Sequence, residues 1–166
     1  TEAVKILKLL IEKHPEAVRH EGTIFIAIQT TKSPEFCQVL IEAYPGSERI
    51  ADTHGMLPLH WACRRNAFAT VEYLYKLYPD AVNHASTKGM YPIHFAMRRI
   101  KDRNKIAAAL EIVQYLLDCD HNVKFQKWQE RMSLLCMACQ LTGHQEFNDS
   151  FIDTALEIIK ILYDAH

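Results

Sequence analysis

Apolar residues recur along the chain at helical spacing, in short segments separated by polar and proline-containing turns. The first segment, residues 2–13, places a wide apolar stripe on one side of a helix and leaves Lys5, Lys8 and Glu12 outside it. Pro15 is expected to end this helix, because the residue before a proline is driven out of the helical region. A helix with so broad an apolar face needs a neighbour to cover it.

Two more helices are predicted in the next stretch, a short one over residues 23–30 and a longer one over residues 34–44. Ser33 and Pro34 predict the start of the longer helix, with the serine as its cap and the proline at the first helical position. Similar endings close each longer apolar segment, at residues 10–18, 40–50, 73–82, 115–123 and 161–166. The repeating unit is therefore a short helix, a longer helix and a polar turn.

One sequence block is repeated almost in full. The stretch GMLPLHWACR, from Gly55 to Arg64, returns 34 residues later as GMYPIHFAMR, from Gly89 to Arg98. Fainter echoes at residues 23–27 and 132–139 extend the series, with spacings of 35, 34 and 42 residues between equivalent alanines. These alanines are Ala27, Ala62, Ala96 and Ala138. A fixed period of this length is typical of a solenoid.

The block Pro-Leu-His-x-Ala at residues 58–62, with its counterpart at 92–96, resembles the ankyrin repeat. The resemblance spans the chain, strongly over residues 52–99 and more weakly over 16–50 and 128–166. It implies a single all-α domain, a solenoid of about four helix-turn-helix repeats plus a leading helix. We expect the boundaries 1–15 for the second helix of a preceding repeat, then 16–50, 51–84, 85–126 and 127–166 for repeats one to four. The chain is expected to be part of a longer protein.

Extra residues are predicted between the helices of repeats three and four. Ala62 and Tyr73 are 11 residues apart, whereas Ala96 and Tyr115 are 19 apart, which places eight extra residues within 97–108. The block Ala-Leu-Glu-Ile at 109–112 returns 46 residues on, which places about twelve extra residues within 141–154. Because both insertions fall in one connection of the unit, the stacking of the repeats should be preserved.

Composition narrows the function classes. The chain has 166 residues, 49% of them hydrophobic, and a net charge of −1, so no global field would recruit nucleic acid or an anionic membrane. Five irregularly spaced cysteines favour reduced thiols and an intracellular, most simply cytoplasmic, setting. No apolar run approaches the roughly 20 residues that cross a bilayer.

The sequence offers no catalytic constellation. No nucleophile-elbow, zinc-protease, phosphate-loop or dinucleotide motif is present. Cys136 and Cys139 have the spacing of half a zinc site or a redox pair, but in the repeat register both fall on helix-packing positions. His60 and His94 recur with the repeat, and the resemblance implies that each ties neighbouring backbone together by hydrogen bonds. We therefore expect a protein that is not an enzyme and that holds neither a cofactor nor a metal.

Paired arginines are the more informative polar residues. Arg64 and Arg65 stand at the end of one first helix, and Arg98 and Arg99 at the end of the next, at positions that the resemblance assigns to a concave groove. They are either solvated cations at helix C-termini or a basic groove that fits an acidic or phosphorylated peptide.

The resemblance also assigns the turn tips to the partner-binding rim. These residues are Thr53, His54, Met56, Thr87, Lys88, Met90, Gln129, Glu130 and Met132. Methionine recurs at all three tips, either as an adaptable exposed contact or packed between turns. Gly55 should supply the backbone freedom of its turn.

These observations predict a non-catalytic scaffold that binds another protein through its concave groove and turn tips. Two alternatives stay open at this point. The repeats could be a structural spacer with no partner of its own, or the groove could bind nucleic acid or a phosphate ligand, for which affinity would fall steeply with salt. No insertion into a membrane is expected.

Overall fold

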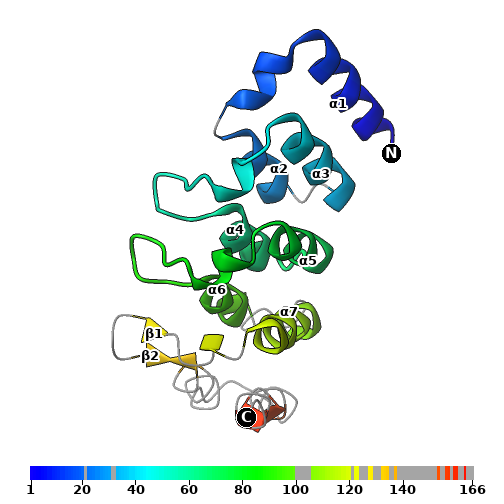
Figure 1. Ribbon diagram of the computed structural model, residues 1–166. Coiled ribbons are helices and arrows are strands. Elements are labelled where there is room, and N and C mark those ends of the chain that lie inside the picture. Colours follow the sequence, from blue (N-terminus) through cyan, green and yellow to red (C-terminus); the bar gives the residue numbers. More distant parts are fainter. Residues whose placement is uncertain are drawn as a thin grey trace.

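A computed structural model describes residues 1–20, 22–30, 33–99, 106–120, 122–123, 127–128, 132–134, 137, 153, 156–157, 159–160 and 163. The helices stack in pairs, one pair after another, from the N-terminal to the C-terminal end (Figure 1). The predicted all-helical solenoid is confirmed.

Each helix pair joins a first helix to a second helix. The first helices are α2 (Thr23–Gln29), α4 (Pro58–Arg65) and α6 (Pro92–Arg99). The second helices are α3 (Pro34–Ala43), α5 (Phe68–Leu77) and α7 (Ile106–Cys119), preceded in the chain by the leading helix α1 (Glu2–Lys13). Figure 1 shows the second helices along one side of the stack and the long turns before α4 and α6 on the other.

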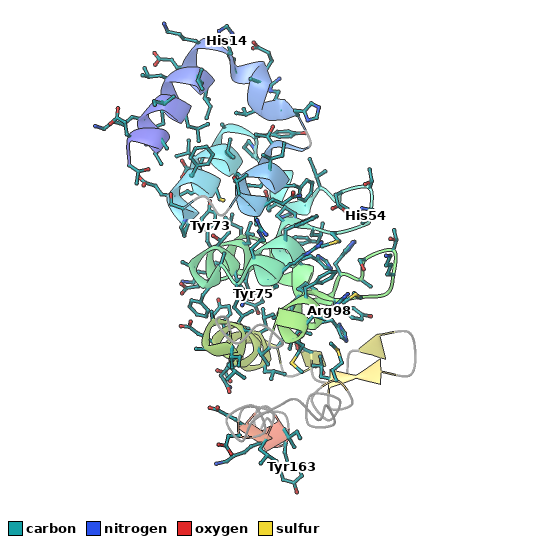
Figure 2. The ribbon with its side chains drawn as sticks, turned by 180° about the vertical axis from the view of Figure 1, so that it is seen from behind. His14, His54, Tyr73, Tyr75, Arg98 and Tyr163 are labelled. Carbon is teal, nitrogen blue, oxygen red and sulfur yellow. The ribbon has the colours of Figure 1, made fainter. Side chains whose placement is uncertain are left out.

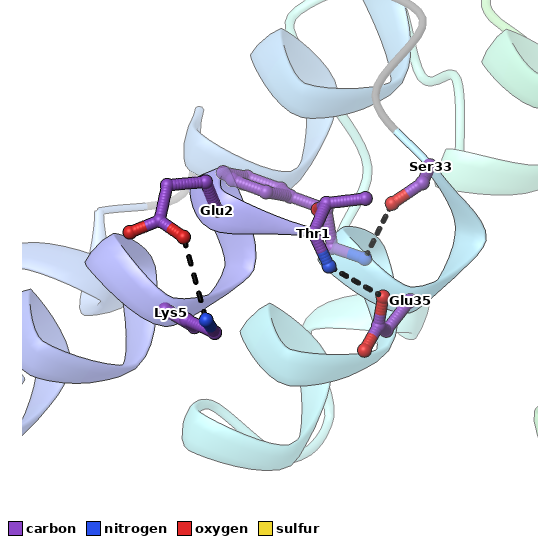
Figure 3. A network of polar contacts seen from close by, with 6 residues as sticks. Thr1, Glu2, Lys5, Ser33 and Glu35 are labelled. Carbon is purple, nitrogen blue, oxygen red and sulfur yellow. Dashed lines mark hydrogen bonds and ion pairs between the residues drawn. The ribbon is translucent and has the colours of Figure 1, made fainter.

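The N-terminal end is held by polar contacts at helix starts (Figure 3). The Ser33 hydroxyl accepts a hydrogen bond from the N–H of Phe36 at 3.3 Å, which confirms the predicted cap of α3. A cap of this kind stabilises a helix by about 1 kcal/mol. The amino group of Thr1 lies 3.6 Å from the carboxylate of Glu35, so the start of α1 sits beside the start of α3. Both groups are exposed, and the ion pair adds little stability.

Short 3-10 helices follow the second helices, where the sequence predicted only polar turns. They are η1 (Pro15–Arg19), η2 (Ser47–Arg49) and η3 (Pro79–Asn83). Two of them bury apolar residues, Val18 in η1 and Ala81 and Val82 in η3. The prediction of a polar turn was wrong for these two segments, because Val18 after Pro15 and Ala81 and Val82 after Pro79 belong to the core.

The core runs along the row of first helices. Ala27, Ala62 and Ala96 are all buried, as their equivalence in the repeat predicts. A methyl side chain at these positions lets α2, α4 and α6 approach closely and pack against one another. Leu40 and Leu74 of the second helices fill the space behind them.

The connection between α6 and α7 differs from that between α4 and α5. Only Asn66 and Ala67 lie between α4 and α5, and Asn66 takes a left-handed conformation that ends α4. Helix α7 begins at Ile106, so residues 106–108 of the predicted insertion are helical. The described residues also include two short antiparallel strands, β1 (Lys127–Trp128) and β2 (Met132–Ser133), on the same side as the long turns (Figure 1).

Candidate partner-binding groove

The turn before α4 is organised by Asp52. One carboxylate oxygen of Asp52 accepts hydrogen bonds from the N–H groups of His54 and Met56, at 2.8 and 2.9 Å. The N–H of Gly55 donates to the carbonyl of Asp52, and the N–H of Asp52 donates to the carbonyl of Met56. Gly55 has φ +67°, a left-handed conformation in which glycine is favoured. These bonds fix the tip that presents His54.

Ser86 organises the turn before α6 in the same way with fewer bonds. Its hydroxyl accepts from the N–H of Met90 at 3.1 Å, and its own N–H donates to the carbonyl of Met90. The two tips are also joined directly, because the N–H and the hydroxyl of Thr87 both donate to the carbonyl of His54 at 2.9 Å. The neighbouring turns therefore form one continuous rim.

His60 and His94 start the first helices. Nδ1 of His60 accepts a hydrogen bond from the N–H of Leu57, and Nδ1 of His94 accepts from the N–H of Tyr91, both at 3.1 Å. Because a backbone N–H can only donate, each Nδ1 is unprotonated and the neutral ring carries its proton on Nε2. Burial lowers the pKa of each histidine to about 4, which keeps both rings neutral. Each ring therefore fixes the start of its own first helix, and the wider predicted role in joining adjacent backbone and loop stays a prediction.

A pocket of about 400 Å³ lies between the two turns and the first helices α4 and α6. It is lined by His54, Met56, Arg64, Ser86, Lys88, Met90, Phe95 and Arg98. Figure 2 shows His54 and Arg98 on the same side of the stack, opposite Tyr73 and Tyr75 of α5. We call this pocket the basic groove, or simply the groove. Its described lining holds three cationic side chains, one exposed histidine and no carboxylate.

The two arginines of the groove are held by contacts with their own repeats. The guanidinium of Arg64 lies over the ring of Trp61, 4.9 Å from its centroid, and the indole N–H of Trp61 donates to Asp52 at 2.9 Å. Stacking occupies the face of the guanidinium and leaves its N–H edges available for an anion. In the next repeat, Nη1 of Arg98 lies 3.9 Å from the sulfur of Met90. Both arginines are thus oriented before any ligand arrives.

The structure answers the open question about the methionines. Met56 and Met90 are buried and form the apolar floor of the groove, so they pack beneath the turns and are not exposed contacts. The tips Thr53 and Thr87 are exposed but do not line the groove.

Arg65 lies away from the groove, in contrast to the predicted row of four guanidinium groups. Its Nη2 donates to the backbone carbonyl of Gln29, at the end of α2 in the preceding helix pair. Neighbouring residues on a helix point about 100° apart, so Arg64 and Arg65 face different neighbours.

Several predicted positions lie outside the described part of the chain. The side chains of Arg99 and Met132 belong to this group, although their backbones lie in α6 and β2. Gln129, Glu130, Cys136 and Cys139 are not described at all.

Two lining residues were not predicted from the sequence. Ser86 is equivalent to Asp52 by the 34-residue spacing, and its position at the base of a tip could have identified it. Phe95 packs edge-on against His60 of the preceding first helix, with ring centroids 5.7 Å apart. One part of Phe95 nevertheless lines the groove.

A family model for ankyrin repeats, in three copies, matches residues 2–85. The chain belongs to the ankyrin repeat family. Ankyrin repeats are in general protein-interaction modules and are typically not catalytic. Among curated proteins, none matches this chain.

Other classes of site find no support in the described residues of this ankyrin domain. Histidine, cysteine and carboxylate side chains do not gather there in groups of three that could hold a metal ion. Among the described helices, none combines the length and the apolar character that a bilayer span requires.

Proposed function

We propose that this ankyrin domain is a non-catalytic scaffold that binds an acidic or phosphorylated segment of another protein in the groove between the turns before α4 and α6. The observation that carries the proposal is the composition of the groove. Arg64, Lys88 and Arg98 surround a floor made by Met56 and Met90. A segment with carboxylates or a phosphate beside an apolar side chain fits such a lining.

Arginine suits this role because its guanidinium offers two parallel N–H groups to a carboxylate or phosphate. Stacking on Trp61 restricts the Arg64 side chain in advance, so less conformational entropy is lost when the partner binds. The rim is equally fixed, since Thr87 joins the two tips. A preformed surface with little ordering cost is what a stacked-repeat scaffold supplies.

We place this interaction inside the cell. The described cysteines are free thiols, and burial raises the pKa of Cys37 to about 11 and that of Cys63 further still. Buried neutral thiols at core positions fit a reducing compartment such as the cytoplasm.

The test uses a short fluorescein-labelled peptide with the core Glu-Leu-Glu-Glu and a matched peptide in which glutamine replaces each glutamate. Fluorescence anisotropy should show binding of the acidic peptide and at least about tenfold weaker binding of the neutral one. The double variant R64E/R98E should bind the acidic peptide more weakly than the wild type by a similar factor. R65E is the matched control, because Arg65 carries the same charge on the same helix but contacts Gln29.

Equal affinity for the acidic and neutral peptides would count against the proposal. A single-stranded oligonucleotide serves as competitor in the same assay. Tighter binding of the oligonucleotide than of the peptide would favour the nucleic-acid alternative. A pull-down from cell extract in which R64E/R98E leaves every captured protein unchanged would favour the spacer.

A further inference from the structure

The turns before α4 and α6 share their backbone hydrogen bonds but begin with different side chains. The N–H of Asp52 donates to the carbonyl of Met56 at 3.0 Å, and the N–H of Ser86 donates to the carbonyl of Met90 at 2.9 Å. The glycine of each turn donates to the carbonyl of the first residue at 2.8 Å, and the two glycines have φ +67° and +70°. The two turns therefore have the same local backbone arrangement, and their first side chains can be compared directly.

The first side chain of each turn differs in charge and in the number of donors that it satisfies. The carboxylate of Asp52 accepts three hydrogen bonds, two from backbone N–H groups of its turn and one from the indole of Trp61. The hydroxyl of Ser86 accepts one, from a backbone N–H of its turn. Phe95 stands at the position of Trp61 and has no N–H to donate. The turn before α6 therefore lacks the carboxylate that anchors the turn before α4.

Ser86 also keeps a hydrogen-bond donor at the basic groove. The residue is 8% exposed and is one of those that line the groove. A hydroxyl has one proton to donate in addition to the lone pairs with which it accepts. Within the part of the chain that the structure describes, the Ser86 hydroxyl accepts from Met90 and donates to no other group. This donor is therefore available to an acceptor that enters the groove from outside.

The charges around this hydroxyl determine which acceptor fits. Arg64, Lys88 and Arg98 line the same groove. A carboxylate can accept from the hydroxyl with one oxygen and from a guanidinium with the other, whereas a neutral carbonyl leaves the cations without a counter-charge. We propose that an aspartate or glutamate side chain of the partner places its carboxylate on Ser86. The partner thus supplies to the turn before α6 the anion that Asp52 supplies to the turn before α4.

This assignment rests on the proposed function and names the group of the partner that enters the basic groove. The preference for a carboxylate over a phosphate comes from the Asp52 turn. There one carboxylate oxygen is bonded to the turn and the other to a side chain. A partner carboxylate on Ser86 repeats this arrangement, with one oxygen on the turn and the other on Arg64 or Arg98. A phosphoserine carries three acceptor oxygens and up to two negative charges, so it forms a separate arm of the test.

Three substitutions at one position test the assignment, with the labelled acidic peptide of the anisotropy assay as the probe. Ser86→Ala removes the donor and should weaken binding about three- to tenfold. Ser86→Asp places a carboxylate at the same position from within the chain, and it should weaken binding at least about tenfold by repelling the partner's carboxylate. Ser86→Asn has the shape of the aspartate without its charge, and it should bind the peptide at least about threefold more tightly than Ser86→Asp.

Two controls separate this contact from folding and from overall charge. Ser86→Asp should melt at or above the Tm of Ser86→Ala, because a carboxylate can accept the N–H groups of the turn as Asp52 does. Thr53→Asp adds the same charge to an exposed turn tip that does not line the groove. It should change the affinity for the acidic peptide by less than about threefold.

A double-mutant cycle identifies the carboxylate that contacts Ser86. Each glutamate of the peptide is replaced in turn by glutamine, and every peptide is titrated against the wild type and Ser86→Ala. At one glutamate the loss of affinity should be at least about threefold smaller in Ser86→Ala than in the wild type, because the contact is already absent. At the other glutamates the losses should be equal in the two proteins. A peptide with phosphoserine at the coupled position should bind no more tightly than the glutamate peptide.

Several results would overturn the assignment. Wild-type affinity in both Ser86→Ala and Ser86→Asp, while R64E/R98E still loses the peptide, would remove Ser86 from the site and leave the proposed function intact. Additive losses at every glutamate would do the same, as would an equal loss in Thr53→Asp and Ser86→Asp. Tighter binding of the phosphoserine peptide that depends on Ser86 would give the position to a phosphate. Equal binding of acidic and neutral peptides by the wild type would instead overturn the proposed function and this assignment together.

Discussion

The carbonyl oxygen of His54 accepts two hydrogen bonds from Thr87, one from the backbone N–H and one from the hydroxyl, both at 2.9 Å. This contact joins the turn before α4 to the turn before α6. Gly55, the residue after His54, is close to the same threonine, since a Cβ added at Gly55 would lie 3.0 Å from the N of Thr87 and 3.1 Å from its Cγ2. The rim of the basic groove therefore depends on a glycine that is not itself among the residues lining the groove.

Replacement of Gly55 by alanine should destabilise the domain by about 2–3 kcal/mol. The left-handed conformation costs alanine about 1 kcal/mol, and the contact with Thr87 adds to it. Gly46→Ala is the matched control, because Gly46 also has positive φ but a Cβ there meets nothing within 4 Å. Urea denaturation should show a loss of about 1 kcal/mol for Gly46→Ala. Equal losses of stability for Gly55→Ala and Gly46→Ala would mean that the close contact with Thr87 is easily relieved.

Much of the fold could be predicted from the sequence because one block is repeated with its key residues in register. In both α4 and α6, proline is the first residue of the helix, histidine is the third, and an alanine further along is buried. Each of these residues has one local physical role, which is the same in the two helices. The 3-10 helices were not predicted, because a proline at the end of a helix with polar residues near it is typical of a surface turn. In the structure Val18 and Val82 of these segments are buried.

The site was harder to predict than the fold. Arg64 and Arg98 line the same pocket, since their position relative to the buried alanine is the same, and their role in binding stays a prediction. Arg65 was not, because the helical rotation between adjacent residues aims it at Gln29. The orientation of Met56 and Met90 depends on tertiary contacts between turns, which a local pattern does not contain.

The turn before α4 should be more sensitive to its polar anchor than the turn before α6. Asp52 accepts from the N–H groups of His54, Met56 and Trp61, whereas the hydroxyl of Ser86 accepts from one. We expect Asp52→Ala to cost about 2–4 kcal/mol in the free energy of unfolding and Ser86→Ala about 1 kcal/mol. Chemical denaturation of the two variants beside the wild type measures the difference. Equal losses would show that the three bonds to Asp52 are not additive.

Acid should destabilise the domain through its buried histidines. The pKa values of His60 and His94 are about 4 when folded, against 6.5 for an ordinary histidine, mainly because burial disfavours the charged ring. The unfolded chain binds protons first as the pH falls. The stabilising contribution is therefore complete above pH 6.5 and is lost progressively toward pH 4, by about 1.4 kcal/mol per pH unit for each histidine.

Urea denaturation at pH 7.5, 6.0 and 5.0 measures this loss. His60→Asn is the informative variant, because an asparagine oxygen can accept the N–H of Leu57 but does not titrate. We expect His60→Asn to be less stable than the wild type at pH 7.5 and to lose less stability between pH 6 and pH 5. An unchanged pH dependence would show that His60 is not one of the titrating groups.

The affinity of the basic groove should depend on the ring beneath Arg64 as well as on the charge. Trp61 contributes a face for the guanidinium and an N–H for Asp52. Trp61→Leu removes both, and Trp61→Phe removes only the N–H. If the stacked arginine is preorganised for an anion, Trp61→Leu should weaken binding of the acidic peptide about three- to tenfold, and Trp61→Phe should weaken it less.

Both variants lose the hydrogen bond to Asp52, so the difference between their affinities for the acidic peptide isolates the stacking. Isothermal titration calorimetry at constant salt, with Arg64→Gln as the reference for complete loss of the charge, provides the measurement. Equal affinities for the leucine and phenylalanine variants would mean that Arg64 reaches the ligand without support from the ring.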